Sequence, residues 1–317
     1  MDGLLDRVSA RAVAGYTPSA DCELSFDPLA PTIFHQPWWL DATGGDHAEA
    51  VVMQSGRKIA SFPYTRIPLR RRQTLCGMPA LTPALGPALQ EGSGAACNRA
   101  LRHAQITREL LAQLPPCTGF RQVLHRGTRD ALVYQEGGYQ AAVQFTFEVA
   151  PAPAAILWGR MGEAMRLSVA RAGRRYRVAG THDTGVLAAM ATKERGTDAA
   201  TLSRVAAAAI GHAQGHIATA CDAGGKVGAA LFTVWDARSA YFVASTGLRN
   251  LADDALCLLF WEAMQHAASR DLIFDFADFA TPARASLLTG FGGDIRPRYV
   301  IGKANLAHKV VNWLGRV

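Results

Sequence analysis

Apolar and polar residues alternate in short runs along the first half of the chain, and turn residues separate these runs. Two of the runs flank Gly56 and predict a β-hairpin, because alternation with a period of two is typical of strands. A longer run with helical periodicity follows and ends before Pro115 and Pro116. The elements expected in this half are strands at 48–54 and 58–64, a helix at about 95–114, and strands at 120–125 and 140–149.

The second half repeats the order of hairpin, helix and strand. Asp253 and Asp254 mark the start of its long helix, since carboxylates favour the N-terminal end of the helix dipole. Pro151 and Pro153 stiffen the segment between the halves. The elements expected here are helices at 156–172 and 198–213, strands at 216–222, 226–235 and 240–245, a helix at 252–268, a strand at 272–276, a short helix at 282–289 and a strand at 298–301.

This repeated order predicts a duplicated α/β domain. We place the boundary at the proline segment, which gives domains 1–152 and 153–317. A chain of 317 residues is long enough for each half to bury its own core.

The composition is that of a globular protein, with 49% apolar and 19% charged residues, and it excludes a disordered chain. The apolar runs are too short for a transmembrane helix, and the first 20 residues lack the apolar block of a secretory signal. We therefore expect a cytoplasmic protein. Six cysteines stand without a C-x-x-C pair, and we expect them to be buried thiols.

The chain is basic, with a formal net charge of +7 and a pI near 9.3. Arginines cluster at 70–72 and 171–177. Such clusters suit phosphate-bearing partners, namely a nucleotide, a CoA tail, a tRNA or an anionic membrane. A solvated basic surface explains the same residues.

Several short sequence motifs, or phrases, occur in the same order as in the Fem-type branch of the GNAT-fold acyl- and aminoacyltransferases, which the chain therefore resembles. The resemblance covers about residues 31 to 303. It rests on Gly-Lys-Val-Gly-Ala-Ala-Leu-Phe at 225–232, Ala-Tyr-Phe-Val-Ala-Ser-Thr-Gly at 240–247, Phe-Asp-Phe at 274–276, Gly-Phe-Gly-Gly at 290–293 with Tyr299, Phe-His-Gln-Pro-Trp-Trp at 34–39, and the segment 138–147.

The resemblance implies two GNAT-like domains, each a mixed, mostly antiparallel sheet flanked by helices. It places the acceptor on the first domain and the donor on the second. The implied reaction is attack of an amine of a small molecule, sugar or peptide on an activated ester or thioester, which forms an amide. The co-substrate is then acyl-CoA or aminoacyl-tRNA, with no permanently bound cofactor and no metal.

The resemblance also suggests site residues. Arg166 and Arg171 fall on the family's basic helix, and guanidinium groups hold phosphates through paired donors. Asp275 ends a strand where a carboxylate orients or deprotonates an amine, although it equally suits capping the next turn. The expected substrate contacts are Trp38, Asp41, Tyr241, Arg298 and Tyr299.

Two positions depart from the family pattern. Leu287 and Leu288 stand where peptidoglycan-type members carry Phe-Lys, whose lysine is thought to stabilise the oxyanion. The loop 247–254 brings two carboxylates to the place where acetyl-CoA users bind pyrophosphate. A second hypothesis therefore stays open, namely a catalytically degenerate GNAT pair that binds nucleic acid or an envelope-assembly partner.

His212 and His216 have a metal-pair spacing, but the glutamate of a zinc-protease helix does not stand between them, and Gly215 separates their elements. No nucleophile elbow, P-loop or dinucleotide fingerprint occurs in the sequence. The stretch 303–317 has an apolar helical face that suits packing against the second domain or an anionic membrane surface. The oligomeric state stays open.

Overall fold

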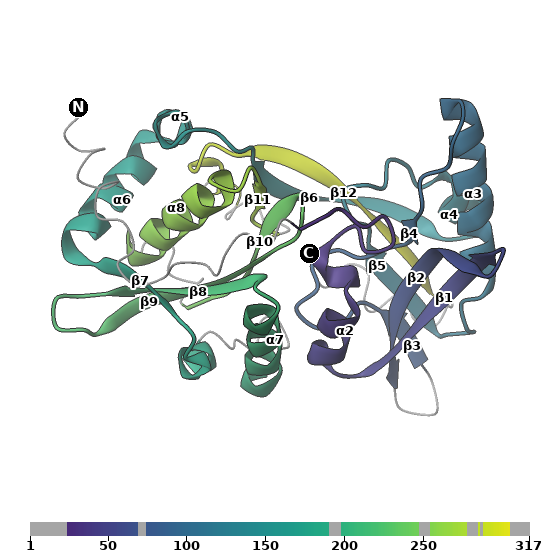
Figure 1. Ribbon diagram of the computed structural model, residues 1–317, viewed down its shortest axis with the longest axis horizontal. Coiled ribbons are helices and arrows are strands. Elements are labelled where there is room, and N and C mark those ends of the chain that lie inside the picture. Colours follow the sequence, from purple (N-terminus) through teal and green to yellow (C-terminus); the bar gives the residue numbers. More distant parts are fainter. Residues whose placement is uncertain are drawn as a thin grey trace. The chain divides into compact units, whose positions relative to one another are not determined.

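The computed structural model describes residues 24–68, 74–189, 198–246, 254–277, 285 and 288–304. The chain forms two compact units (Figure 1). Unit 1 contains residues 1–25 and 145–296, and unit 2 contains residues 26–144 and 297–317.

Unit 2 is built on the strand order β1-β2-β3-β5-β12, with β4 paired to β2. Strands β3 and β5 run parallel, and the other neighbouring pairs are antiparallel. Its elements are η1 (Ile33–His35), α2 (Pro37–Thr43), β1 (Asp46–Gln54), β2 (Arg57–Pro68), β3 (Thr74–Gly77), β4 (Ala88–Leu89), α3 (Ala96–Ala112), β5 (Gly119–Val123), α4 (Leu132–Glu136) and most of β12 (Asp294–Ala304).

Unit 1 has the strand order β6-β11-β10-β9-β8-β7. Strands β10 and β11 run parallel, and the other neighbours are antiparallel. Its elements are the second half of β6 (Gln140–Val149), α5 (Ala154–Arg160), α6 (Glu163–Arg175), β7 (Arg177–Thr181), η3 (Thr184–Ala189), α7 (Ala199–Gly211), β8 (Gly215–Cys221), β9 (Val227–Trp235), β10 (Ser239–Ser245), α8 (Asp254–Ala268) and β11 (Ile273–Asp275).

The two units share one topology. In each, three antiparallel strands lead into a helix, and the helix crosses over to a strand parallel to the third: β1-β2-β3-α3-β5 and β8-β9-β10-α8-β11. The predicted mixed, mostly antiparallel α/β fold is confirmed. The repeat contains one strand more than the sequence pattern showed, because the four-residue β3 lies between the predicted hairpin and helix.

A strand from the other half of the chain completes each sheet. Strand β6 pairs with β11 in unit 1, and β12 pairs with β5 in unit 2. The chain therefore changes unit at Phe145 and again at Pro297, inside these two strands. The boundary expected at 152/153 lies a few residues beyond the change at Phe145, and Pro153 is the N-cap residue of α5.

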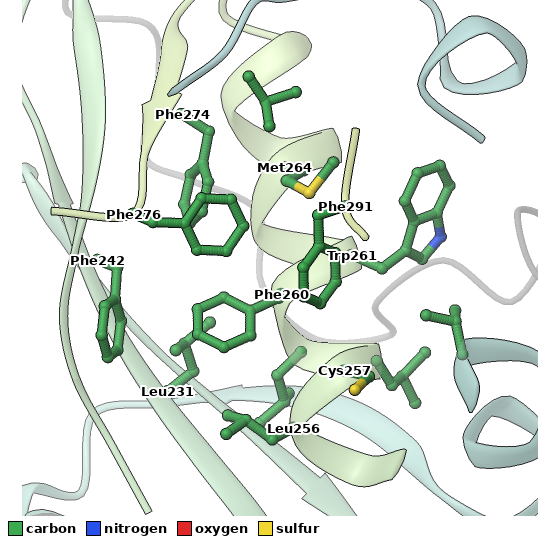
Figure 2. Close-up of a cluster of buried hydrophobic side chains, with 14 of the residues drawn as sticks. Leu231, Phe242, Leu256, Cys257, Phe260, Trp261, Met264, Phe274, Phe276 and Phe291 are labelled. Carbon is green, nitrogen blue, oxygen red and sulfur yellow. The ribbon is translucent and has the colours of Figure 1, made fainter. Parts of the chain in front are cut away.

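Helices α6 and α8 cover one face of the unit 1 sheet and bury a large aromatic core (Figure 2). Phe260 of α8 lies at its centre, with ring centroids 5.2 Å from those of Phe242 and Phe276 and 5.6 Å from that of Phe291. Because α8 is buried on most of its sides, it is apolar almost throughout. The core of unit 2 gathers around Phe62, Phe120 and other apolar side chains.

Three sequence expectations are corrected. The helix expected at 156–172 is two helices, because Gly162 is extended and donates its N–H to the carbonyl of Gly290 at 2.8 Å. Strand β7 was missed because it directly follows the arginine cluster of α6. Cys97 is exposed on α3 rather than buried. Within the described ranges, no helix combines the length and apolar character needed to cross a membrane.

Candidate active site

Strands β10 and β11 are paired over only three residues and then diverge. Tyr241 and Asp275 form the last pair. Strand β10 continues to Ser245, whereas Phe276 donates its N–H to the carbonyl of Phe147 on β6 at 3.0 Å. Parallel strands that separate at their carboxyl ends are a common place for ligand-binding groups in α/β folds. We call this place the β10/β11 fork.

The carboxylate of Asp275 is buried at the fork and accepts two hydrogen bonds on Oδ1. The hydroxyl of Thr146 donates to it at 2.6 Å, and the backbone N–H of Ala277 donates at 2.8 Å. Ala277 has a positive φ of 48°, so the second bond holds an uncommon turn. The turn-capping role that the sequence suggested for Asp275 is confirmed.

Polar groups line one face of the sheet at the fork. Glu148, Asp275 and Tyr241 lie in register across β6, β11 and β10, so their side chains share a face. All three are buried. The next register row, Val149, Phe274 and Ala240, belongs to the apolar core under α6 and α8. The sheet thus separates a packed apolar face from a face that carries ionisable groups.

Tyr241 is held by the turn between β9 and β10. Its hydroxyl donates to Oδ2 of Asp236 at 2.9 Å, while Oδ1 of Asp236 accepts from the N–H groups of Arg238 and Ser239. Burial, and then the carboxylates of Asp236 and Asp275, raise the pKa of Tyr241 well above its ordinary value. The phenol is therefore a neutral hydrogen-bond donor near neutral pH.

The two arginines expected to hold phosphate lie on α6. Arg171 makes a bidentate pair with Asp254 in the first turn of α8, at 2.9 and 3.1 Å. This guanidinium lowers the pKa of Asp254 through its hydrogen bonds. Arg166 is half-buried one turn earlier. One of the two carboxylates noted in the loop 247–254 is thus neutralised by an arginine.

Four other expected contacts belong to unit 2. Trp38 is half-buried and Asp41 exposed on α2, whereas the neighbouring Trp39 is the core residue and donates to the hydroxyl of Thr82 at 3.0 Å. The remaining two are on β12. Arg298 is buried there, and Tyr299 packs against the core. The structure therefore brings Asp275 and Tyr241 together at the fork and places these four in the other unit.

Sequence reasoning missed a buried histidine pair in unit 2. The rings of His35 and His125 lie 5.3 Å apart. His35 bonds to the hydroxyl of Thr32 and the carbonyl of Gly86, and His125 bonds to the carbonyl of Pro87. Burial lowers the pKa of His35 to about 3 and that of His125 to about 4. Both are neutral structural groups.

Packing accounts for the Gly-Phe-Gly-Gly phrase. Phe291 is buried in the unit 1 core, and Gly292 has a φ of +78°. A Cβ on Gly292 would lie 2.6 Å from the carbonyl oxygen of Arg160. Leu288, at the place of the family lysine, is also buried in this core.

Other sequence signals lie wholly or mostly outside the described residues. These are the loop 247–253, Leu287, most of the helix expected at 282–289, the arginines at 70–72 and the stretch 305–317. Among the residues that are described, no three His, Cys, Asp or Glu side chains gather to hold a metal ion. His212 caps α7, and His216 lies near the start of β8.

Several solved structures are similar to this chain. FemX matches with a TM-score of 0.58 at 10% identity, over 94% of this chain and 95% of that chain. A conserved protein of unknown function from Bacteroides thetaiotaomicron VPI-5482 gives 0.50 at 12% identity, over 94% and 97%. The C-terminal domain of a putative lysylphosphatidylglycerol synthetase from Agrobacterium fabrum gives 0.49 at 14%, over 88% and 91%.

No protein-family model matches the chain, and no curated protein matches its sequence. At identities of 10 and 12%, the matches to FemX and to the Bacteroides protein show a shared fold and nothing finer. The match to FemX nevertheless extends over nearly the whole of both chains. The chain therefore has the fold of FemX, as the resemblance in its sequence predicted.

Proposed function

We propose that this protein is a transferase that moves an activated acyl or aminoacyl group to an amine and forms an amide bond. One observation supports this above the others: a buried carboxylate, Asp275, is held by Thr146 where two parallel strands diverge. A fixed carboxylate at such a place suits the binding and orientation of an amine. The Fem-type fold supports the same class of reaction.

In the proposed reaction the amine nitrogen attacks the carbonyl carbon of an ester or thioester. The new C–N bond forms as the C–O or C–S bond breaks, and the alcohol or thiol leaves with a proton that the amine gives up. Asp275 orients the amine and stabilises the positive charge that develops on nitrogen during the attack. It then accepts the proton that the nitrogen gives up, and that proton passes to the leaving alcohol or thiol. Thr146 and the Ala277 N–H keep the carboxylate in one orientation.

We assign the donor to unit 1 and the acceptor to unit 2, as the family resemblance implies. The donor is acyl-CoA or aminoacyl-tRNA, and Arg166 and Arg171 are its proposed phosphate contacts. The acceptor is an amine of a small molecule, sugar or peptide, with Trp38, Asp41, Arg298 and Tyr299 as its proposed contacts. Tyr241 lies beside Asp275 in the strand register, and its neutral hydroxyl donates to Asp236.

The donor is identified by a thermal-shift and mass-spectrometric screen of the purified protein against acyl-CoAs and charged tRNAs. A ligand that binds the native state must raise its unfolding temperature. We expect one donor class to give a shift. Binding of neither class would contradict the transferase and favour a binding module, in which Asp275 only caps its turn.

A further inference from the structure

One end of unit 1 carries four exposed cations. Arg174 and Arg175 lie in the last turn of α6, Arg177 begins β7, and Lys226 lies in the turn between β8 and β9. We call this set the basic hairpin surface. We propose that it docks on a membrane that carries anionic phospholipids.

Strand register brings β7 beside the β8–β9 hairpin. Arg177 pairs with Cys221 on β8, and Cys221 pairs with Val227 on β9. Cross-strand partners point to the same face of a sheet, so Arg177 and Val227 lie two strands apart on one face. Lys226 immediately precedes Val227. The cation of β7 and the cation of the hairpin turn therefore lie at the same end of the unit 1 sheet.

Tyr176 links the end of α6 to the same hairpin. A Cβ on Gly228 would lie 2.6 Å from Cε1 of Tyr176, so the ring rests directly on the hairpin backbone. The guanidinium carbon of Arg175 lies 5.1 Å from the centroid of that ring. Arg175 is thus held above the hairpin by a cation–π contact.

The surface keeps a surplus of positive charge. Across the described part of the chain, no ion pair joins any of its four cations to a carboxylate. The carboxylate of the hairpin turn is Asp222, which accepts the backbone N–H groups of Gly224 and Lys226 at 2.9 and 3.0 Å. The net field at this end of unit 1 therefore attracts anions.

The tip of the hairpin is small and apolar. Residues 223–228 are all exposed, and Lys226 is the one charged side chain among them. Val227 is 42% exposed at the end of its strand. An apolar tip surrounded by cations suits the membrane interface, where acyl chains meet anionic headgroups. The cations contact the phosphate groups there, and the apolar tip is buried from water.

A nucleic acid fits this surface less well. It offers phosphates to the cations but no apolar layer to Val227. Single strands also use exposed aromatic faces on which bases stack. The ring of Tyr176 is instead in contact with Arg175 and Gly228 of the protein itself.

The basic hairpin surface lies at the end of the sheet toward which β10 and β11 run. Ser245, the last residue of β10, pairs with Leu231, and β9 extends beyond this pair to Val227. The surface and the β10/β11 fork thus open toward the same end of unit 1. The docking itself does not depend on the proposed transferase reaction.

Vesicle co-sedimentation of the full chain tests the proposal without any substrate. We expect binding to phosphatidylcholine vesicles that contain phosphatidylglycerol and none to pure phosphatidylcholine vesicles. Each neutralised cation should weaken partitioning about fivefold. Arg175→Gln with Arg177→Gln should therefore lose about 25-fold, and added salt should weaken the wild type. Val227→Ser should weaken binding with no change in charge.

The matched control is Arg99→Gln with Arg102→Gln, which removes two exposed charges from α3 of unit 2. It should bind vesicles as the wild type does. An equal loss of vesicle binding in the control would mean that the net charge of the protein, and not the basic hairpin surface, determines binding. Failure of the wild type to bind anionic vesicles would overturn the proposal. Tight binding of a tRNA or an RNA duplex in place of vesicles would assign the surface to nucleic acid instead.

Discussion

At the scale of single residues, one hydrogen bond organises the candidate site. Thr146 and Asp275 are far apart in sequence, and both are buried where β6 and β11 meet. The sequence pointed to Asp275 through the Phe-Asp-Phe phrase, but it gave no sign of Thr146 as its partner. Only the pairing of β6 with β11 brings them together.

Thr146→Val removes the hydroxyl and keeps the shape of the side chain. The buried carboxylate then loses a donor, and we expect the free energy of unfolding to fall by about 1–3 kcal/mol. Thr146→Ser keeps the hydroxyl and should recover most of this loss. Urea unfolding of the two variants measures the difference. Equal stability of wild type and Thr146→Val would show that the bond contributes nothing to the fold.

Gly292 and Gly225 have the same left-handed backbone conformation but differ in the room available for a side chain. Their φ values are +78° and +80°, but an added Cβ meets the Arg160 carbonyl at 2.6 Å in the first case and nothing within 4 Å in the second. Gly225→Ala should cost about 1–2 kcal/mol for the left-handed conformation. Gly292→Ala carries the same cost plus the clash, and we expect at least about 2 kcal/mol more. Similar losses in thermal unfolding would contradict this account.

At the scale of elements, most of the periodic segments were predicted, whereas strands β3 and β7 and the break between α5 and α6 were not. Strand β6 has the predicted bounds, and α3 and β8 agree within three residues. The four-residue β3 offers too few positions for a period to show. The helix break at Gly162 depends on a bond to Gly290, which no local pattern encodes.

The packing of α8 on its sheet gives a prediction at this scale. Phe260→Ala removes the ring that contacts Phe242, Phe276 and Phe291, and we expect a loss of about 3–5 kcal/mol in the free energy of unfolding. Leu101→Ala on the exposed face of α3 is the control and should change stability by less than about 0.5 kcal/mol. Denaturant unfolding of both variants, compared with the wild type, measures these two changes in the free energy of unfolding.

At the scale of the whole molecule, the chain forms two units with the same topology, and a strand from the other half of the sequence completes the sheet of each unit. The sequence order predicted the repeat because hairpins and crossover helices are local. It did not predict that β6 and β12 complete the sheets of the opposite halves, since such pairing is set by tertiary contacts. The division of the site residues between the units follows from the same long-range arrangement.

Both units bury histidines, so we expect stability to fall in acid. Burial lowers the pKa of His35 to about 3 and those of His125, His216 and His266 to about 4. The unfolded chain takes up these protons near pH 6.5, so the contribution is present above that pH and is lost as pH falls toward 4. Glu262 acts in the opposite direction, because burial raises its pKa to about 7.

Urea unfolding between pH 7.5 and about pH 5 measures this dependence. Four lowered histidines outweigh one raised glutamate, and we expect a net loss of at least about 3 kcal/mol. His266→Gln should make the pH dependence shallower, because it removes one of the four buried imidazoles. Constant stability over this range would mean that the histidines are not buried as described.

The most direct test of the transferase is detection of the amide product with wild-type protein and with Asp275→Asn. The donor is the one found by the binding screen, with a mixture of amines as acceptors. We predict amide formation that falls on the order of 10²-fold or more in Asp275→Asn. It should persist in Asp183→Asn, which alters an exposed turn-capping carboxylate of the same unit. Wild-type rates in a folded Asp275→Asn protein would contradict the role assigned to the β10/β11 fork.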